Sequence, residues 1–274
     1  MIKNLKMTVL IDNVAVEPLV GEWGLSILIE ADGLKILLDA GESGQFVRNA
    51  ATLQTDLAQV DVGVLSHAHY DHADGMEAFF ACNDRAKFLL REGCRENCFG
   101  IKDGELHYNG IRKGMLSRFA DRIRFVSGAF PLAEGIWLLP HRAADYSPIA
   151  RRNDLYVKED GCCRPDDFSH EQSLVVETEK GLVIFNSCSH TGVKNCLDDV
   201  REMLGDHSVY AYVGGLHLFK LTDGELSAFA EELRAGGVSQ ILTGHCTGEH
   251  AIAFLRQLLG DRVRQLSAGF TCVF

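Results

Sequence analysis

Three histidines and one aspartate lie within six residues, in the segment Ser66–Gly75, which reads SHAHYDHADG. His67 and His69 are two positions apart, so in an extended chain their side chains point to the same side. Asp71 and His72 open the next turn. Zinc, iron and manganese accept imidazole nitrogens and carboxylate oxygens as ligands. Burying four such groups together is costly unless something pairs them, so the segment predicts a metal site.

Several histidines lie where predicted strands end. His67, His190 and His245 each follow directly on a predicted strand, and His217 lies a few residues past another. Strand-end loops are where α/β sheets place their chemistry. We therefore expect the ligands from these distant segments to converge on one pocket.

The segments that must position these side chains alternate between strand and helix patterns, which is typical of a mixed α/β sandwich. Asp32-Gly33 predicts a tight hairpin, and Thr222 with Glu225 has the spacing of a helix capping box. Helices are predicted around Phe46–Leu53, Met76–Phe80 and Thr191–Leu204, after Thr222, and around Ile252–Leu259. Strands are predicted at Leu5–Ile11, Gly24–Ala31, Leu34–Leu38, Asp61–Ser66, Lys87–Leu90, Arg122–Val126, Gly135–Leu139, twice within Leu174–Phe185, and at Ser208–Val213, Gln240–Leu242 and Phe270–Phe274.

The composition limits the classes of protein that fit. The chain has 274 residues, 46% of them hydrophobic, with only five prolines and no linker-like tract, which favours one compact domain. A net charge of −11 argues against a nucleic-acid partner. No apolar stretch is long enough to cross a bilayer, so no membrane association is expected. Nine cysteines without a signal peptide suggest reduced thiols and a cytoplasmic location.

The pattern His-x-His-x-Asp-His after a strand resembles the defining motif of the metallo-β-lactamase superfamily. The segments GEWGLSILIE, ILLDAG, CSHTG, GGLHL and TGHCTG resemble the branch labelled dihydropteroate-synthase-related or methanopterin-precursor synthase-like. The resemblance implies a four-layered αββα sandwich over residues 1–274. It also implies a binuclear centre, most simply with two zinc ions, while iron or manganese suit the same ligands.

The resemblance assigns the ligands in two groups. It implies that His67, His69 and His170 hold one metal ion, and that Asp71, His72 and His245 hold the other. His170 enters by its spacing alone, because it precedes Cys188 by 18 residues (188 − 170), as a third-motif histidine precedes the bridging residue in the family.

The family's usual bridging aspartate is missing from this sequence. The segment NSCSH offers Cys188 or His190 in its place, and we favour His190 as the ligand, with Cys188 either a second ligand or a buried thiol. His217 is expected to bind substrate or a metal, or to be a satisfied histidine at a strand end. Asp39, in the turn Asp39-Ala40-Gly41, resembles the family's supporting aspartate.

The stretch between the second and third motifs is longer than the family usually has. We expect an insertion within 82–165, read as three strands separated by polar loops, and such insertions commonly cover an active site. Phe99, Tyr108, Phe119 and Tyr146 are candidates for its pocket walls.

The predicted function is a metal-dependent hydrolase acting on a small molecule. A metal-bound hydroxide would attack an ester, thioester, lactone or phosphoester, and Asp71 would orient that water or pass its proton to the leaving group. An iron-dependent oxidoreductase of the same fold, a pterin-related transferase and a sensor with a vestigial site are the alternatives. The sequence leaves the substrate and the oligomeric state open.

Overall fold

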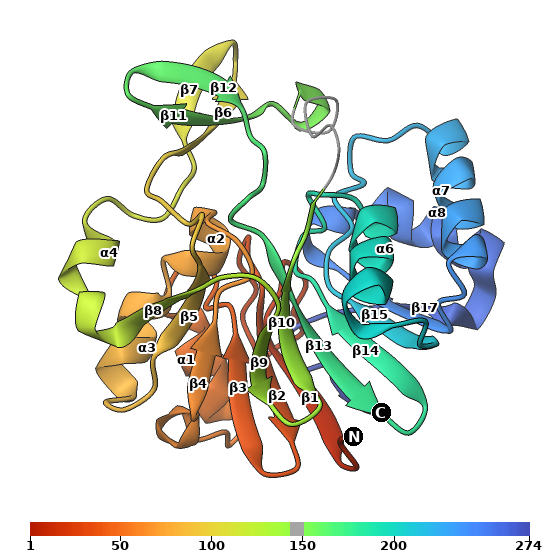
Figure 1. The fold of residues 1–274 in the computed structure, drawn as a ribbon, viewed down its shortest axis with the longest axis horizontal. Coiled ribbons are helices and arrows are strands. Elements are labelled where there is room, and N and C mark those ends of the chain that lie inside the picture. Colours follow the sequence, from red (N-terminus) through yellow and green to blue (C-terminus); the bar gives the residue numbers. More distant parts are fainter. Residues whose placement is uncertain (143–150) are drawn as a thin grey trace.

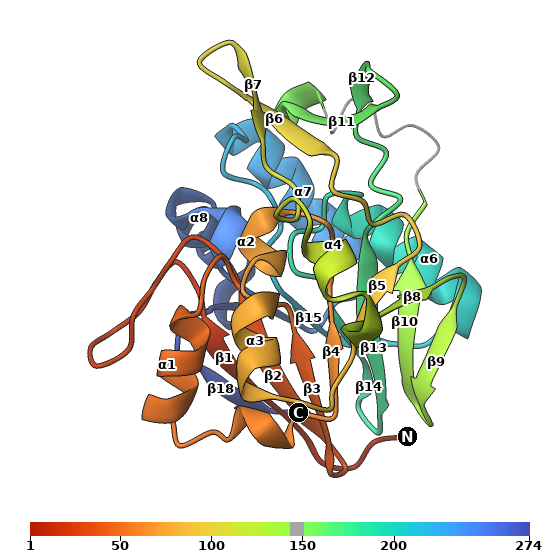
Figure 2. The same ribbon diagram turned by 90° about the vertical axis from the view of Figure 1, so that its left-hand side faces the viewer.

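The computed structural model describes residues 1–142 and 151–274. Two seven-stranded sheets stack face to face, and helices cover the outer face of each sheet (Figures 1 and 2). These four layers confirm the expected αββα sandwich. A third, four-stranded sheet lies at one end of the stack, above the edge where many strands terminate (Figure 1).

The first large sheet contains the N-terminal hairpins. Asp32 and Gly33 both have positive φ, 46° and 94°, which closes the predicted hairpin between its second and third strands. From β3 to β8 the neighbouring strands are parallel, so their carboxyl ends share one edge. In spatial order the strands are β18 (Thr271–Val273), β1 (Leu5–Ile11), β2 (Ser26–Ala31), β3 (Leu34–Leu38), β4 (Val62–Val64), β5 (Phe88–Arg91) and β8 (Ile123–Val126).

The second large sheet carries the C-terminal motifs. Its four strands from β14 to β17 are parallel, so the segments that follow them gather at a single edge. In spatial order the strands are β17 (Val263–Gln265), β16 (Gln240–Thr243), β15 (Val209–Val213), β14 (Gly181–Phe185), β13 (Gln172–Thr178), β10 (Ile136–Pro140) and β9 (Phe130–Ala133).

Three apolar layers hold the sandwich together. Between the sheets, Met7 and Val9 share one buried cluster with Val183 and Phe185, and two further clusters lie under the helices of each outer layer. Burial of such side chains contributes about 1.5–3 kcal/mol each. The helices are α1 (Gln45–Thr52), α2 (Tyr70–Ala73), α3 (Met76–Cys82) and α4 (Met115–Arg118) over the first sheet, and α6 (Val193–Leu204), α7 (Asp223–Ala235) and α8 (Glu249–Leu259) over the second.

The ends of the helices follow local sequence signals. Thr222 caps α7, and its hydroxyl and the side chain of Glu225 make the reciprocal hydrogen bonds of the predicted capping box. Short 3₁₀ turns lie at Leu57–Gln59, Ala120–Arg122, His245–Thr247 and Gly260–Arg262. Within the described ranges, none of the helices combines the length and the apolar character that a membrane crossing requires.

The third sheet corrects one expectation from the sequence. Residues read there as polar loops form an antiparallel sheet of four strands, which we call the roof sheet. It escaped detection because its strands are short and mostly exposed, so they show little alternation of apolar and polar residues. In spatial order it consists of β12 (Cys162–Pro165), β11 (Leu155–Glu159), β6 (Cys98–Lys102) and β7 (Glu105–Tyr108).

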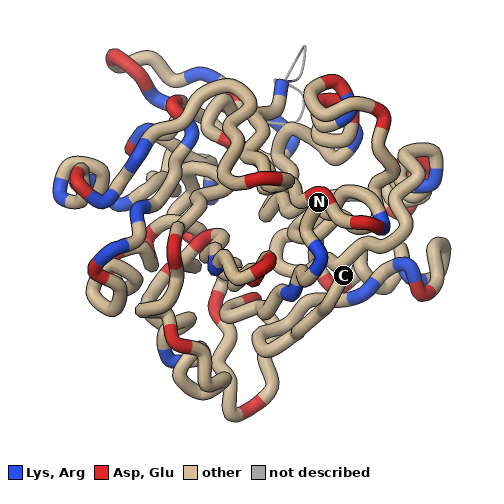
Figure 3. The backbone as a smooth tube through the Cα atoms, turned by 60° about the horizontal axis from the view of Figure 1, so that its bottom comes forward, with Lys and Arg blue, Asp and Glu red and all other residues tan. Residues whose placement is uncertain are grey.

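Lysine and arginine alternate with acidic residues along the backbone rather than forming one continuous basic stripe in the view of Figure 3.

Candidate metal centre

The histidine-rich segment lies at the carboxyl end of β4. Val64 ends the strand, His67 and His69 follow in extended chain, and α2 begins at Tyr70. The side chains of His67, His69, Asp71 and His72 are all buried, at 0–6% exposure. The local geometry therefore brings all four predicted ligands to one place.

Asp39 fixes the orientation of His72. One carboxylate oxygen of Asp39 accepts the backbone N–H of Ser66 at 2.7 Å, and the other accepts the Ser66 hydroxyl at 2.7 Å and the His72 Nδ1–H at 2.8 Å. Because a neutral imidazole carries one proton, this contact leaves His72 Nε2 with a bare lone pair. Asp39 thus occupies the supporting position that the family resemblance implied.

His245 faces His72 from the other sheet. Its Nδ1 lies 3.0 Å from Asn13 Oδ1, and the same amide oxygen accepts the Gly24 N–H, which identifies it as an acceptor. His245 Nδ1 therefore carries the proton, and its Nε2 presents a lone pair. The two Nε2 atoms of His72 and His245 are 3.2 Å apart.

A carboxylate completes this arrangement. Asp71 Oδ2 lies 3.3 Å from the His245 Nε2 and 3.6 Å from the His72 Nε2. Two lone pairs and a negative charge at such distances repel one another in a buried site unless a cation lies among them. Without a metal, a proton takes that role: burial alone lowers the pKa of His245, but the hydrogen bond and charge of Asp71 raise it to about 9. A divalent ion fits the same donors.

A second donor group lies beside the first. Nitrogens of His67, His69 and His190 fall within 4.8 Å of one another. His67 Nδ1 contacts the Ser66 hydroxyl at 2.8 Å, while its Nε2 has no partner. Both ring nitrogens of His190 are buried without a partner. Such orphaned nitrogens fit metal ligands, because an unsatisfied buried polar atom is otherwise costly.

Glu171 places His190 in this group. Its two carboxylate oxygens accept the backbone N–H groups of His190 and Thr191 at 2.8 and 2.9 Å. The residue before, Ser189, has a positive φ of 54°, and the Phe168 ring stacks on the His190 ring at 5.0 Å between centroids. The strand β14 ends at Phe185, and the chain turns sharply to aim the imidazole inward.

The histidine trio differs from the one expected from the sequence. We expected His170 to join His67 and His69, but His190 fills that place. His170 Nδ1 instead accepts the backbone N–H of Ala68 at 3.1 Å, so its proton lies on Nε2. His170 precedes β13, whereas His190 follows β14, whose carboxyl end lies at the shared strand edge.

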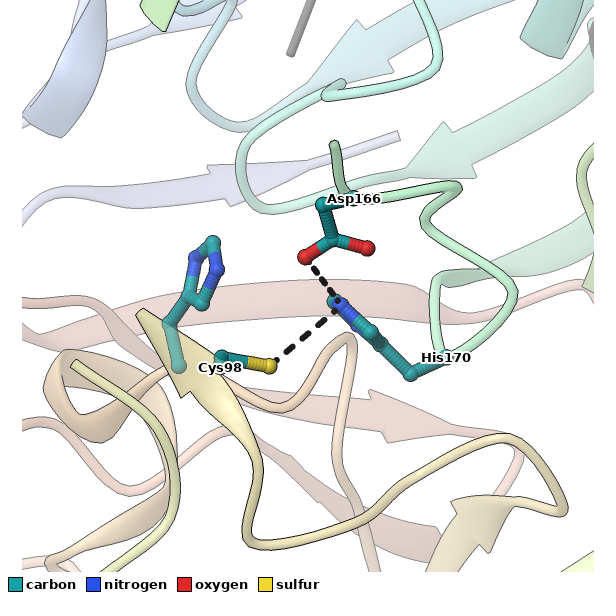
Figure 4. Close-up of side chains that lie close together, drawn as sticks. Cys98, Asp166 and His170 are labelled. Atoms are coloured by element: carbon teal, nitrogen blue, oxygen red, sulfur yellow. Dashed lines mark hydrogen bonds and ion pairs between the residues drawn. The ribbon is translucent and has the colours of Figure 1, made fainter. Parts of the chain in front are cut away.

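The Nε2 of His170 lies in a buried cluster with Cys98 and Asp166, and this cluster shares His69 with the trio. Asp166 Oδ2 accepts from the His170 Nε2 at 3.1 Å, and Cys98 Sγ lies 3.7 Å away on the same side (Figure 4). Both ring nitrogens of His170 are therefore engaged. This arrangement suits a residue that supports the chain between His67 and His69. His170 also belongs to a four-residue group, with His69, Cys98 and Asp166, whose donors could hold a metal ion.

Cys188 lies where the two donor groups meet. Its Sγ is 3.2 Å from the His72 Nε2, and it also groups with His67, His190 and His245. The sequence left the choice between Cys188 and His190 open, and the structure brings both to the centre. His217 lies beside His190, with 4.5 Å between the ring centroids, and its buried Nδ1 has no partner.

The histidines of the first trio are suited to metal binding at neutral pH. Burial and then neighbouring imidazoles hold the pKa of His67 and of His190 well below the ordinary value. The same causes lower the pKa of His69 to about 3. Neutral imidazoles bind metal ions without first losing a proton.

The centre opens into a cleft of about 420 Å³ below the roof sheet. The roof is hydrogen-bonded to the histidine-rich loop: Tyr70 N–H donates to Asn109 O, and the Ile111 N–H donates to Ala68 O. Such a volume is in the range of small-molecule sites. Its lining includes His69, Asp71, Cys188, His190, His217 and His245 below, and Lys102, His107, Tyr108, Asn109 and Asn153 above.

The roof contributes polar groups that sequence reasoning missed. Asn153 is only 8% exposed, and its Oδ1 has no hydrogen-bond partner; Asn109 Oδ1 is likewise unpaired. His107 is exposed and also lines the cleft. No local motif marks these residues, because a four-stranded sheet brings them together over the centre.

The expected pocket walls are confirmed only in part. Tyr108 lines the cleft, and Phe99 packs against the Tyr108 ring. Phe119 packs instead on Phe80, under α3, because it belongs to the apolar cluster of the first helical layer. Tyr146 lies outside the described residues.

The fold and the donor groups together resemble those of the metallo-β-lactamase superfamily. A profile of that superfamily matches residues 24–81, which include the histidine-rich segment. The fold implies binding of divalent metal ions, for which the described residues offer several ligand groups.

Particular relatives share nearly the whole chain. It is 27% identical over 270 residues to the 7,8-dihydropterin-6-methyl-4-(β-D-ribofuranosyl)-aminobenzene-5′-phosphate synthase of Methanocaldococcus jannaschii, covering 92% of this chain and 90% of the relative. The crystal structure of Tm1679, described as a metal-dependent hydrolase of the β-lactamase superfamily, superposes with a TM-score of 0.84 at 27% identity and 98% coverage of both chains. The metallo-β-lactamase fold protein YhfI of Bacillus subtilis shares the fold, with a TM-score of 0.61, 10% identity and coverage of 99% and 100%.

Proposed function

We propose that this protein is a metal-dependent hydrolase that holds two divalent ions, most simply zinc, in the cleft below the roof sheet. The ions would lie at the floor of the cleft, which is formed by the His67–His69–His190 trio, the Asp71–His72–His245 group and Cys188. One observation carries the proposal: the bare Nε2 atoms of His72 and His245, 3.2 Å apart, point at each other beside the Asp71 carboxylate. The trio of His67, His69 and His190 supplies the second group of donors. Bound metal ions would lower the pKa of a water molecule and polarise the substrate's carbonyl or phosphoryl oxygen.

The residues of the chain then have distinct tasks. Asp39 and Asn13 hold the tautomers of His72 and His245, so that both rings present Nε2 to the centre. Asp71 lines the cleft, where its carboxylate is placed to orient a water molecule and to carry a proton to the leaving group. His217 has an unpaired Nδ1 and is placed to contact the substrate.

The reaction proposed is cleavage of an ester, thioester, lactone or phosphoester in a small molecule. The cleft volume of about 420 Å³ supports a substrate of that size. A pterin-related reaction is the second candidate, because the archaeal relative that matches 92% of this chain is named as a dihydropterin-phosphate synthase.

The test measures metal content by plasma mass spectrometry on protein purified without chelator or added metal, followed by a panel of esters, lactones and phosphoesters. We expect about two ions per chain and hydrolysis that a chelator abolishes and added zinc restores. Asp71→Asn should retain part of the metal and lose hydrolysis. Stoichiometric iron with activity only toward oxygen or sulfur substrates would favour the oxidoreductase, while turnover of a dihydropterin phosphate alone would favour the transferase. Failure to bind any metal would overturn the proposal.

A further inference from the structure

Cys188 lies at the junction of the two donor groups of the centre. Its Sγ falls within 4.8 Å of donors from His67 and His72 in one cluster, and from His190 and His217 in another. A third cluster joins it to His245 and Cys246. The Cys188 sulfur therefore lies within reach of donors from both the His67–His69–His190 trio and the Asp71–His72–His245 group.

The spacing of the donors fits direct coordination. Zinc bonds of about 2.0–2.1 Å to nitrogen and 2.3 Å to sulfur place tetrahedral donors roughly 3.3–3.7 Å apart. Cys188 Sγ is 3.2 Å from the His72 Nε2, and Asp71 Oδ2 is 3.6 Å from the same nitrogen. Asp71, His72, His245 and Cys188 therefore form a four-donor set of the size that a tetrahedral ion needs.

No second carboxylate competes for this place. Among the described residues that line the cleft, Asp71 is the only aspartate or glutamate, and it already contacts His72 and His245. Two adjacent divalent ions concentrate positive charge in a buried site, which favours an anionic ligand between them. A cysteine thiolate is the anionic ligand that the chain offers there.

We propose that the Cys188 thiolate is a ligand shared by the two metal ions, in the position between the His67–His69–His190 trio and the Asp71–His72–His245 group. This inference rests on the proposed two-metal function. It assigns His190 to the trio and the bridge to Cys188, so the two residues of the NSCSH segment have different roles.

The neighbouring sulfur provides a matched control. Cys246 Sγ is 3.3 Å from Cys188 Sγ, and both side chains are buried. Cys246 shares a donor group with Cys188 and His245, but no group described here joins it to the histidine trio. Its thiol is placed to donate to the Cys188 sulfur rather than to bridge the two groups.

The test replaces the native ions by cobalt(II) and records the near-ultraviolet sulfur-to-cobalt charge-transfer band, with the cobalt content of each sample measured in parallel. We expect the band in the wild-type chain and in Cys246→Ser. Cys188→Asp should lose the band yet keep two ions, because a carboxylate can bridge. Cys188→Ala should bind its last ion at least about tenfold more weakly.

The outcomes separate this inference from the function it rests on. Two bound cobalt ions without a sulfur band in the wild-type chain would overturn the bridge and leave the hydrolase intact. The bridge would also be wrong if the band survived in Cys188→Asp and vanished in Cys246→Ser. Absence of bound cobalt would instead overturn the two-metal function. Protection of Cys188 from alkylation by metal ions, read by mass spectrometry of the wild-type chain, supplies an answer that needs no variant.

Discussion

The floor and the roof of the cleft are built on different principles. The floor gathers ligands from the carboxyl ends of strands in two packed sheets, and its side chains are buried and held by fixed hydrogen bonds. The roof is a small, largely exposed sheet joined to the floor through backbone contacts of Asn109 and Ile111. The floor is therefore suited to a fixed chemical task, and the roof to selecting what reaches it.

The two regions also differ in where their unpaired polar atoms lie. On the floor, the orphaned nitrogens of His67 and His190 converge on one another, which suits metal ions. On the roof, Asn109 and Asn153 line the cleft, and their buried side-chain oxygens have no hydrogen-bond partner among the described residues. The first pattern indicates a cofactor and the second indicates a substrate with hydrogen-bond donors.

The largest effect is expected on the floor itself. His67→Ala removes a predicted ligand and should weaken metal binding by more than about 100-fold. His170→Ala removes the acceptor of the Ala68 N–H and the Nε2–H that bonds Asp166, and it should cost about 10–100-fold, the range for groups that position ligands. Asp166→Asn, which keeps an oxygen for the His170 Nε2–H, should cost less still.

Competition with a chromophoric chelator measures these affinities. Equal losses of metal in His67→Ala and His170→Ala would mean that His170 is itself a ligand, as the sequence alone suggested, and that the supporting role assigned to it is wrong.

The contrast explains what the sequence could predict. The floor's central motif is contiguous, and the strands around it are long and apolar, so β1 and β3 were predicted with the observed bounds. The choice between His170 and His190 depended on which strand end reaches the trio. That is settled by the order of strands in the sheet, which residue spacing does not contain.

The roof shows the opposite limit. Strands such as β7 and β12 have mostly exposed side chains, so their sequences lack the alternation of apolar and polar residues that predicts a strand. The positions of Asn153 and His107 over the centre depend on the pairing of the β6–β7 hairpin with β11, which is distant in sequence. Local patterns predicted an insertion that covers the site, but not which of its residues face the cleft.

A smaller, more selective effect is expected on the roof. Asn153→Ala removes one amide from the cleft and should raise KM about threefold to tenfold with little change in kcat, the cost of one neutral hydrogen bond to substrate. The free energy of unfolding should stay the same or rise slightly, because the Asn153 oxygen has no partner among residues 1–142 and 151–274.

Asn97→Ala is the matched control, since Asn97 precedes β6 but bonds Glu159 away from the cleft. Steady-state kinetics with the substrate found in the hydrolysis panel, together with urea unfolding, measure both effects. A fall in kcat at constant KM in Asn153→Ala would show that the roof takes part in the chemistry. It would contradict the assignment of chemistry to the floor and of substrate selection to the roof.

The last effect concerns the stability of the floor without metal ions. The pKa of His69 is about 3 in the folded chain, below its ordinary 6.5, so the folded state loses stability as pH falls from 6.5. The pKa of His245 is about 9, so its contribution is complete below pH 6.5 and is lost as pH rises toward 9. Each group contributes a slope of at most about 1.4 kcal/mol per pH unit.

Metal-free protein should therefore be most stable near pH 6.5, as measured by urea unfolding between pH 4.5 and 9. His69→Asn should flatten the acid side of the curve, and His245→Asn should flatten the alkaline side. Saturating zinc should remove the alkaline decline in the wild-type chain, because the ion replaces the proton that His245 otherwise holds. If the free energy of unfolding of His245→Asn still falls at alkaline pH as it does in the wild-type chain, the decline originates elsewhere in the molecule. The inference that a metal ion replaces a proton on His245 would then be wrong.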